Sequence, residues 1–339
     1  MTIRQHPAVD AAVLCVALNP AIDLTIEVTN LRPGEVNRAQ RAQQDAGGKG
    51  INVASCLADY GAGVAVTGQL GRDNPALFAA LFAAKGIVDR CLYIDGSTRV
   101  NAKVVDPAQG QTTDINLPGP AQTREEIDAQ IARLEKLIDE LAPALRWAAL
   151  SGSLPPGWPD EVYATLIRRV HAAGGRVVLD TSGRPLGAAL DAAPDIVKPN
   201  RDELAEHLGR PLDSAADVAE AAHELLAAHP GMRLVAVSMG REGAVFVTPD
   251  MALLAHPLDV EPISSVGAGD AMVAGITAAQ LAGLPVDACA RLATAFAAAK
   301  LARLGPHLPA PEAVRSLAEK VRLTEIHPPR CGASRKTHS

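Results

Sequence analysis

The sequence contains few aromatic residues, few cysteines and no apolar run long enough to cross a membrane. Aromatic side chains make up only 3% of its 339 residues, so Ala, Val and Leu must supply most of the 48% hydrophobic fraction. No C-x-x-C pair occurs among the five cysteines, and the nine histidines show no metal-ligand spacing. These patterns argue against a disulfide framework and a structural zinc site, and they are typical of free thiols in a reducing cytoplasm.

Positive charge is also scarce. Lys and Arg number 32 against 38 Asp and Glu, which leaves a net charge of −6. This balance argues against a protein that binds nucleic acid or a membrane surface. The polar residues 1–10 lack the apolar core of a signal peptide. We therefore expect a soluble, cytoplasmic protein in which local basic residues bind any anionic ligand.

The usual nucleotide-binding loop is missing as well, because no G-x-x-x-x-G-K-[ST] motif occurs. A different glycine motif, Val266–Asp270, lies between a strand expected at Val260–Ser265 and an alanine-rich helix expected from about Ala271. A helix N-terminus exposes unpaired N–H groups that attract phosphate, and Gly267 and Gly269 let an anion approach the backbone closely. The motif therefore predicts a phosphate-binding loop.

Asp270 is unexpected in such a loop, because a carboxylate repels phosphate. Its position is explained if Asp270 takes a proton from an attacking hydroxyl, which predicts phosphoryl transfer to an alcohol. The alternative is a simple glycine turn in which Asp270 is the helix N-cap.

Short apolar runs alternate with longer helical patterns along most of the chain. Buried strands are predicted at Ala12–Leu18, Val64–Thr67, Ala148–Leu150, Val177–Leu179, Ile196–Val197 and Leu234–Ser238. Helices are predicted at Ile51–Tyr60, at Ala76–Ala84 before Gly86, and after a capping box of Thr123 and Glu126. This alternation predicts an α/β fold with a mostly parallel sheet covered by helices on both faces.

A second region shows polar alternation instead. It comprises Asp23–Val28, Val36–Gln43, Thr98–Val105 and Thr112–Leu117. We expect these four segments to form a small antiparallel sheet, a lid of about residues 23–43 and 98–117 that covers a ligand. The main domain is expected over 12–324, between a flexible N-terminus at 1–11 and a disordered tail at 325–339.

Two glycine- and amide-containing loops suggest a sugar site. The first long helix is preceded by a glycine-rich loop that contains Gly47, Gly48 and Asn52. Asn52 is either a hydrogen-bonding partner for a sugar hydroxyl or a capping residue. Asp23 follows the first strand, where it either accepts sugar hydroxyls or forms an Asx turn. Ser151 closes a later strand in a loop of small residues.

Basic residues of the lid suggest a phosphate site. Arg99, Asn101 and Lys103 alternate along one strand and therefore share a face. Arg38 and Lys49 are candidates for the same cluster. The alternative is a solvated edge strand with protective charges.

Two further loops suit a nucleotide. Asn200 and Glu203 lie about one helical turn apart after Lys198, so they either orient waters around Mg²⁺ or form a helix N-cap. The segment Ser238–Gly243 is a glycine turn at a strand end, compatible with a nucleotide lying over it.

The order and spacing of these motifs resemble the PfkB (ribokinase-like) family of sugar kinases, from about Ala12 to about Leu323. The first family signature is similar to Gly47–Ala54 and the second to Ser265–Gly275, with Asn200 and Glu203 between them. The resemblance implies a ribokinase-like three-layer α/β/α sandwich with a small β-sheet lid, often used to form a homodimer.

The resemblance also implies ATP and Mg²⁺ as cofactors and assigns roles. Asp270 becomes the catalytic base, and the amides of Gly267, Ala268 and Gly269 form the anion hole. The residues expected to face ATP or its magnesium are Lys198, Asn200, Glu203, Ser238, Gly240 and Gly243. A monovalent cation such as K⁺ is expected at the carbonyls of Ser264 and Val266.

Within the family, several runs are most similar to bacterial 1-phosphofructokinases. They are Leu18–Asp23, Gly34–Asn37, Thr98–Lys103, Thr113–Asn116 and Arg291–Ala295. The resemblance implies transfer of phosphate from ATP to the C6 hydroxyl of fructose 1-phosphate. Lys300 departs from the pattern, replacing a small residue near the expected adenine site.

Three alternatives stay open. Tagatose-6-phosphate kinases and minor 6-phosphofructokinases share much of the pattern, and Leu117–Pro120 is closer to the latter. A nucleoside or an unphosphorylated sugar is a possible acceptor, against which Arg99 and Lys103 argue. A non-catalytic sugar-phosphate sensor is the third, against which Asp270 and Asn200 argue.

Overall fold

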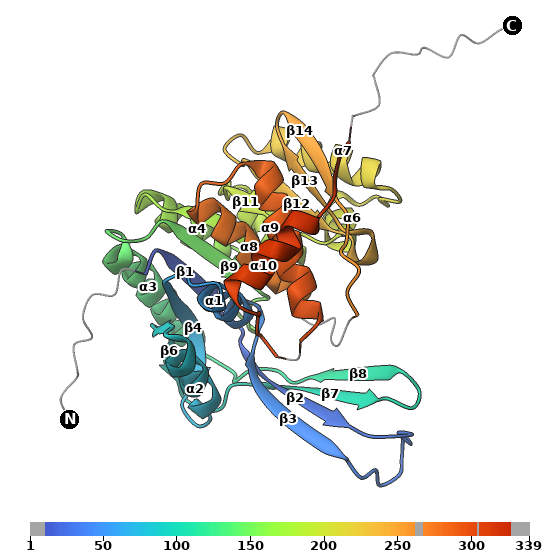
Figure 1. Cartoon of the computed structure of the whole chain (residues 1–339). Helices are drawn as coiled ribbons and strands as arrows, with labels where there is room; N and C mark the ends of the chain where they lie inside the picture. The colour runs from blue at the N-terminus through green and yellow to red at the C-terminus, as the bar shows by residue number, and fades with distance from the viewer. Residues whose placement is uncertain (1–10, 262–266, 304, 327–339) are drawn as a thin grey trace, which may run out of the picture.

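The middle layer of the protein is an eleven-stranded sheet in the computed structural model, which describes residues 11–261, 267–303 and 305–326 (Figure 1). Its strands are β1 (Val13–Ala17), β4 (Val64–Gly71), β5 (Val88–Asp89), β6 (Leu92–Ile94), β9 (Trp147–Ser151), β10 (Arg176–Asp180), β11 (Ile196–Val197), β12 (Leu234–Ser238), β13 (Ala244–Thr248), β14 (Met251–Ala255) and β15 (Leu323–Glu325). All six strands predicted from apolar runs are present.

The order of strands is β15-β14-β13-β12-β11-β10-β9-β1-β4-β5, with β6 beside the far end of β4. Pairing is parallel from β5 to β12 and antiparallel from β12 to β15. The mostly parallel sheet is thus confirmed. Parallel strands aligned in this way place their carboxyl ends along one edge, where ligands bind in open α/β sheets.

Helices cover both faces of the sheet (Figure 1). One face carries α1 (Lys49–Asp59), α2 (Ala76–Lys85), α8 (Ala268–Leu281), α9 (Val286–Leu301) and α10 (Pro311–Lys320). The other carries α3 (Arg124–Leu141), α4 (Val162–Ala172), α5 (Gly183–Leu190), α6 (Arg201–Leu208) and α7 (Ala215–Ala228).

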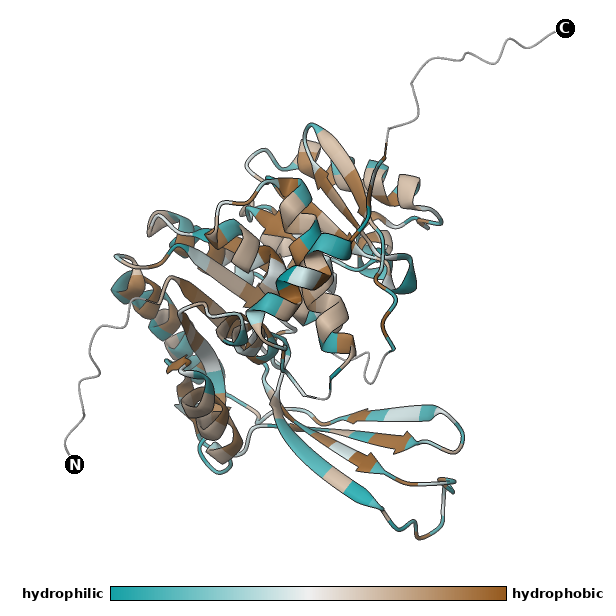
Figure 2. Ribbon diagram, viewed as in Figure 1, coloured by the Kyte–Doolittle hydropathy of each residue, from teal (hydrophilic) through white to brown (hydrophobic). Residues whose placement is uncertain are grey.

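Strand β1 shows why both faces must be covered. Val13 and Cys15 pack into the first helical layer, whereas Leu14 and Val16 pack into the second. Alternate side chains of a strand point to opposite faces, so a strand that is apolar at every position needs a partner on each side. Figure 2 shows the resulting apolar interior.

The predicted helix boundaries are close to those observed. The capping box of Thr123 and Glu126 opens α3, and Gly86 ends α2 in the left-handed conformation with φ 65°. None of the described helices combines the length and apolarity needed to cross a membrane.

A separate four-stranded sheet projects from the carboxyl edge of the central sheet (Figure 1). Its strands, in the order β3-β2-β7-β8, are β2 (Ala21–Glu27), β3 (Arg41–Gly47), β7 (Val100–Asp106) and β8 (Gln111–Asn116). We refer to this sheet as the lid.

Two details of the predicted lid were wrong. The strand expected at Val36–Gln43 begins only at Arg41, because Asn37 closes the preceding loop with hydrogen bonds to both the N–H and the C=O of Arg32. The sheet is also mixed rather than antiparallel, since β2 and β7 run parallel. Both strands start from the same edge of the core and therefore run in the same direction. Strand β2 follows β1 directly. Strand β7 follows Thr98, whose hydroxyl accepts a hydrogen bond from Gly71 N at the end of β4.

The predicted ends of the domain are only partly described. Glu325, expected to start the disordered tail, is the last residue of β15, whose Thr324 pairs with Leu254. The remaining tail from 327 and residues 1–10 lie outside the described part, so the predicted boundaries there stay predictions.

Gly50 ties α1 to β1, and its substitution tests this packing. A Cβ on Gly50 would lie 2.5 Å from the carbonyl oxygen of Val16, whereas one on Gly187 in α5 would lie no closer than 3.9 Å to His207. We expect Gly50→Ala to lower the free energy of unfolding in urea by about 1–3 kcal/mol. The matched change Gly187→Ala should raise it by about 0.5–1 kcal/mol, since alanine has the higher helix propensity. Equal effects of both changes would contradict the close packing at Gly50.

Candidate active site

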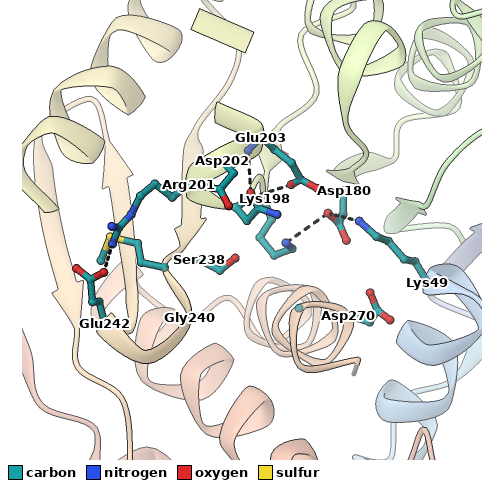
Figure 3. Close-up of a pocket in the computed structure, with 13 residues that line it drawn as sticks. Lys49, Asp180, Lys198, Arg201, Asp202, Glu203, Ser238, Gly240, Glu242 and Asp270 are labelled. Atoms are coloured by element: carbon teal, nitrogen blue, oxygen red, sulfur yellow. Dashed lines mark hydrogen bonds and ion pairs between the residues drawn. The ribbon is translucent and has the colours of Figure 1, made fainter. Parts of the chain in front are cut away.

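A pocket of about 560 Å³ lies at the carboxyl edge of the central sheet (Figure 3). Asp180 at the end of β10, Lys198 after β11 and Ser238 at the end of β12 form its floor. Lys49 from the start of α1 and Asp270 from the start of α8 close one side. Segments far apart in the sequence therefore meet where a parallel sheet presents its ligand-binding edge.

The N-terminus of α8 faces this pocket. The helix begins at Ala268, three residues before the expected Ala271, and its N-cap is Gly267 in the left-handed conformation with φ 81°. No side chain of the described residues caps the helix, so N–H groups of its first turn lack an intrahelical or side-chain partner within that part of the chain. Asp270 is the third helical residue, so the alternative that made it the N-cap was wrong. The expected strand Val260–Ser265 falls mostly outside the described residues.

Asp270 is buried beside the pocket and hydrogen-bonded to a single amide. Asn52 Nδ2 donates to Asp270 Oδ2 at 2.7 Å. Burial, and after it the negative charge of Asp180, raise the pKa of the Asp270 carboxyl, and the net result of all influences is a pKa of about 6. The hydrogen bond from Asn52 and the charges of Lys49 and Lys198 act in the opposite direction. A carboxylate with a pKa near 6 suits a general base at neutral pH.

Asp180 organises the charges of the floor. Its Oδ1 lies 3.3 Å from Lys49 Nζ and 3.3 Å from Lys198 Nζ, so one carboxylate holds two lysines over the pocket (Figure 3). Asp180 Oδ2 and the neighbouring Ser151 Oγ are buried without a hydrogen-bond partner among the described residues. Since buried polar atoms nearly always have partners, this edge fits a polar ligand or bound water.

Sequence reasoning missed Asp180. A signal was available: the residue follows the apolar run Val177–Leu179 at the carboxyl end of a predicted parallel strand, as Ser151 follows Ala148–Leu150. Only the fold brings Asp180 to the pocket, where it meets Lys49 and Lys198.

Asn200 and Glu203 form the helix cap that the alternative interpretation expected. Asn200 Oδ1 accepts from Glu203 N at 2.7 Å, and Glu203 Oε2 accepts from Asn200 N at 2.8 Å. The same two side chains line the pocket. Glu203 Oε1 has no hydrogen-bond partner in the described structure, so the capping box leaves that oxygen available to a ligand.

The turn Ser238–Gly243 borders the far end of the pocket. Ser238 and Gly240 line it, and Gly240 begins a 3₁₀ turn with φ 58°. Gly243 does not line the pocket. A Cβ there would collide with the carbonyl oxygen of Ala255 in β14, so this glycine is explained by strand packing.

The lid brings most of the expected sugar and phosphate residues together. Asn101 Nδ2 donates to Asp23 Oδ1 at 3.2 Å, and Arg99 Nη1 donates to Asn101 Oδ1 at 3.1 Å. Burial raises the pKa of Asp23, against the opposing effects of Asn101, Lys103 and Arg99. Strand β7 lies between β2 and β8, so the edge-strand alternative for these residues was wrong.

Gly47 and Gly48 join the lid to the core. A Cβ on Gly47 would collide with the carboxylate of Asp23, and one on Gly48, at φ 99°, would lie 2.7 Å from Pro20 Cα. Asp23 sits in mid-strand opposite Asp45 rather than in an Asx turn. Asn52 lies inside α1, so it is not a capping residue either.

Besides Gly243, four more expected residues are placed neither at the pocket nor in the cluster of lid residues around Asp23. Arg38 is exposed in the loop before β3, and no contact joins it to the other candidates in the described structure. Lys300 is buried in α9 and approaches Gly267 rather than lining the pocket. Ser264 and Val266, expected to bind a monovalent cation, lie outside the described residues.

Comparison with known proteins agrees with this geometry. The sequence model of the pfkB family carbohydrate kinases matches residues 11–313. The chain belongs to this family of sugar kinases. It is 51% identical over 313 residues to a 1-phosphofructokinase of Rhodobacter capsulatus, covering 92% of this chain and 98% of that protein. It is 49% identical over 316 residues to a 1-phosphofructokinase of Xanthomonas campestris, and this match covers 91% of this chain and 96% of that protein.

Solved structures confirm the predicted family fold. Phosphofructokinase-2 from Escherichia coli, in complex with substrates and products, is 28% identical with a TM-score of 0.83 and covers 91% of this chain and 98% of its own. The same Escherichia coli protein has also been solved in complex with potassium and in a tetrameric inhibited form. The three-layer α/β/α sandwich with its lid is therefore the fold of a pfkB kinase.

The opposing influences on Asp270 can be separated by mutation. Asp180→Asn removes a negative charge, so the pKa of Asp270 should fall below about 6; Asn52→Leu removes a hydrogen bond to the carboxylate, so it should rise. Because protonated Asp270 cannot accept a proton, the acid limb of the kinase rate should move to lower pH in the first variant and to higher pH in the second. The kinase rate is measured from pH 5 to 8 for both variants. Asp128→Asn, at an exposed position of α3, is the control and should leave the pH profile unchanged. If the acid limb moved in the same direction in both variants, Asp270 would not be the group that sets it.

Proposed function

We propose that this protein transfers the γ-phosphate of ATP to the C6 hydroxyl of fructose 1-phosphate, giving fructose 1,6-bisphosphate and ADP. The observation that carries the proposal is Asp270: a buried carboxylate with a pKa near 6 in the first turn of an uncapped helix at the pocket edge. The two relatives at 51% and 49% identity support the choice of substrate.

In the proposed reaction, Asp270 accepts the hydroxyl proton as the sugar oxygen attacks the γ-phosphorus. The bond from that phosphorus to the oxygen bridging the β- and γ-phosphates breaks, and ADP leaves. A positioned base of this kind contributes roughly 10²–10⁴-fold to the rate. The amides of Gly267, Ala268 and Gly269 would stabilise charge on the transferring group, at roughly 3 kcal/mol for each preorganised donor.

ATP would lie along the pocket that is lined by Lys198, Ser238 and Gly240. Asn200 and Glu203 would hold waters of the Mg²⁺ ion, a role for which Glu203 Oε1 and the unpartnered Asp180 Oδ2 are suited. When bound, the ion neutralises charge between the β- and γ-phosphates. Gly243 would act only indirectly, by shaping the turn that carries Gly240.

The sugar would bind where the lid joins the core. Its hydroxyls would be held by Asp23, Gly47, Gly48, Asn52, Asn101 and Ser151. Lys103, half-buried beside Asp114, and Arg99 would bind the 1-phosphate together with Lys49. In this structure Arg99 donates to the carbonyls of Asn19 and Pro20, so its guanidinium must release part of these contacts or share them with the ligand.

Two assembly features complete the proposal. In and beside the lid, Val36 is 92% exposed, Ile115 50% and Leu117 47%, and these exposed apolar side chains support a homodimer formed through the lid. In such a dimer, the exposed Arg38 of one subunit would complete the phosphate site of the other. A monovalent cation at Ser264 and Val266, and a cytoplasmic location where ATP and sugar phosphates are available, stay predictions.

Turnover of a panel of sugars tests the proposal directly. ADP release is measured with MgATP and fructose 1-phosphate, fructose 6-phosphate, tagatose 6-phosphate or free fructose. Fructose 1-phosphate should give the highest kcat/KM, and Asp270→Asn should lower kcat roughly 10²–10⁴-fold without changing the melting temperature by more than a few degrees.

Each other result has a defined meaning. Preference for a 6-phosphate would keep the kinase mechanism but reject the substrate. Near-normal turnover by Asp270→Asn would reject Asp270 as the base. No turnover with any sugar, while calorimetry still shows ATP binding, would favour the sugar-phosphate sensor or a different acceptor.

A further inference from the structure

Lys300 is a buried lysine whose position the reaction above does not explain. It lies in the last turn of α9 and is only 3% exposed. Its side chain runs against the loop that opens α8: a Cβ built on Gly267 would lie 3.3 Å from Lys300 Cε. The ammonium group donates to the carbonyl oxygen of Arg303 at 3.2 Å.

No carboxylate forms an ion pair with Lys300 in the described structure, unlike the buried Lys198 and the half-buried Lys85. Lys85 Nζ lies 2.7 Å from Asp59 Oδ2, and Lys198 Nζ lies 3.3 Å from Asp180 Oδ1. Within the part of the chain that the structure describes, the Lys300 ammonium is therefore buried with one carbonyl hydrogen bond and no ion pair, which costs stability unless the charge serves another purpose.

The charged groups around Lys300 come from three elements. They are Asp270 on α8, Asp45 on β3 and Lys103 on β7, together with the Cys56 thiol on α1. Burial lowers the pKa of Lys300, and the two carboxylates oppose that effect. The carboxylates of Asp270 and Asp45 favour the charged form of the Lys300 ammonium.

We propose that Lys300 is a positioning residue that supplies a fixed positive charge behind the anion hole at the N-terminus of α8. The inference rests on the proposed phosphoryl transfer. Its charge adds to the helix dipole at the point where the γ-phosphate would bind, inside a water-poor region where electrostatic effects are strong. The competing explanation is structural, since a lysine in the last helical turn also stabilises the C-terminus of α9.

Lys300→Met separates the two roles because methionine keeps the length of the side chain and removes the charge. If Lys300 charges the anion hole, kcat falls at least tenfold while the melting temperature stays the same or rises, since an unpaired buried charge is gone. Calorimetry should show a weaker affinity for ATP and an unchanged affinity for ADP, because only ATP places a phosphate at the anion hole. Added methylammonium or K⁺ should restore part of kcat in this variant.

Lys85→Met is the matched control. It leaves Asp59 buried without its cation, so the melting temperature should drop while kcat per folded molecule and the preference for ATP over ADP are unchanged. A Lys300→Met protein that behaves like this control, losing stability but not kcat, would overturn the proposal in favour of the helix-capping role. So would an unchanged ratio of ATP to ADP affinity.

The same measurements keep the two proposals apart. A wild-type protein without turnover on any sugar contradicts the proposed function, and the ATP and ADP affinities still decide the role of Lys300. An active wild type with an equally active Lys300→Met contradicts only the role of Lys300. Lys300→Gln, a polar uncharged variant, repeats the test if the methionine variant fails to fold.

Discussion

The burial of charge at the carboxyl edge of the parallel sheet is the constraint on which the active site depends. Asp180 is held between Lys49 and Lys198, and burial together with these three groups and the amide of Asn52 sets the pKa of Asp270. A buried charge is tolerated only when it is paired or serves a ligand, so each of these residues restricts the position of the others. Burial and Asp180 outweigh the lowering influences, so the pKa of Asp270 is raised to about 6.

The fold supports this charge cluster with apolar packing and glycine. Parallel strands covered on both faces hold the ends of β10, β11 and β12 in register, which keeps the floor of the pocket rigid. Glycines then allow the loops to come close: Gly50 seats α1 on β1, and Gly47 leaves room for the carboxylate of Asp23. Rigid strands with close-fitting loops are what a phosphoryl-transfer site requires, because positioning supplies most of the catalysis.

The lid and the core contribute different chemistry. The core provides the base, the uncapped helix and the loops suited to ATP, whereas the lid provides Asp23, Asn101 and Lys103 on strands that leave the core at its ligand-binding edge. In the proposed reaction, substrate choice is therefore concentrated in the lid, and the kinase chemistry in the core.

The sequence by itself determined six strands of the central sheet and the capping box at Thr123, because each depends on local pattern or on the chemistry of a few neighbours. It left the role of Asn200 open and placed the start of α8 three residues too late. The family resemblance added the role of Asp270. Tertiary structure alone decided that β2 and β7 run parallel, that Asp180 bridges two lysines and that Asn52 binds Asp270. Apart from the Asp180–Lys198 pair, those contacts join residues from 78 to more than 200 positions apart, and no local pattern encodes a partner at that distance.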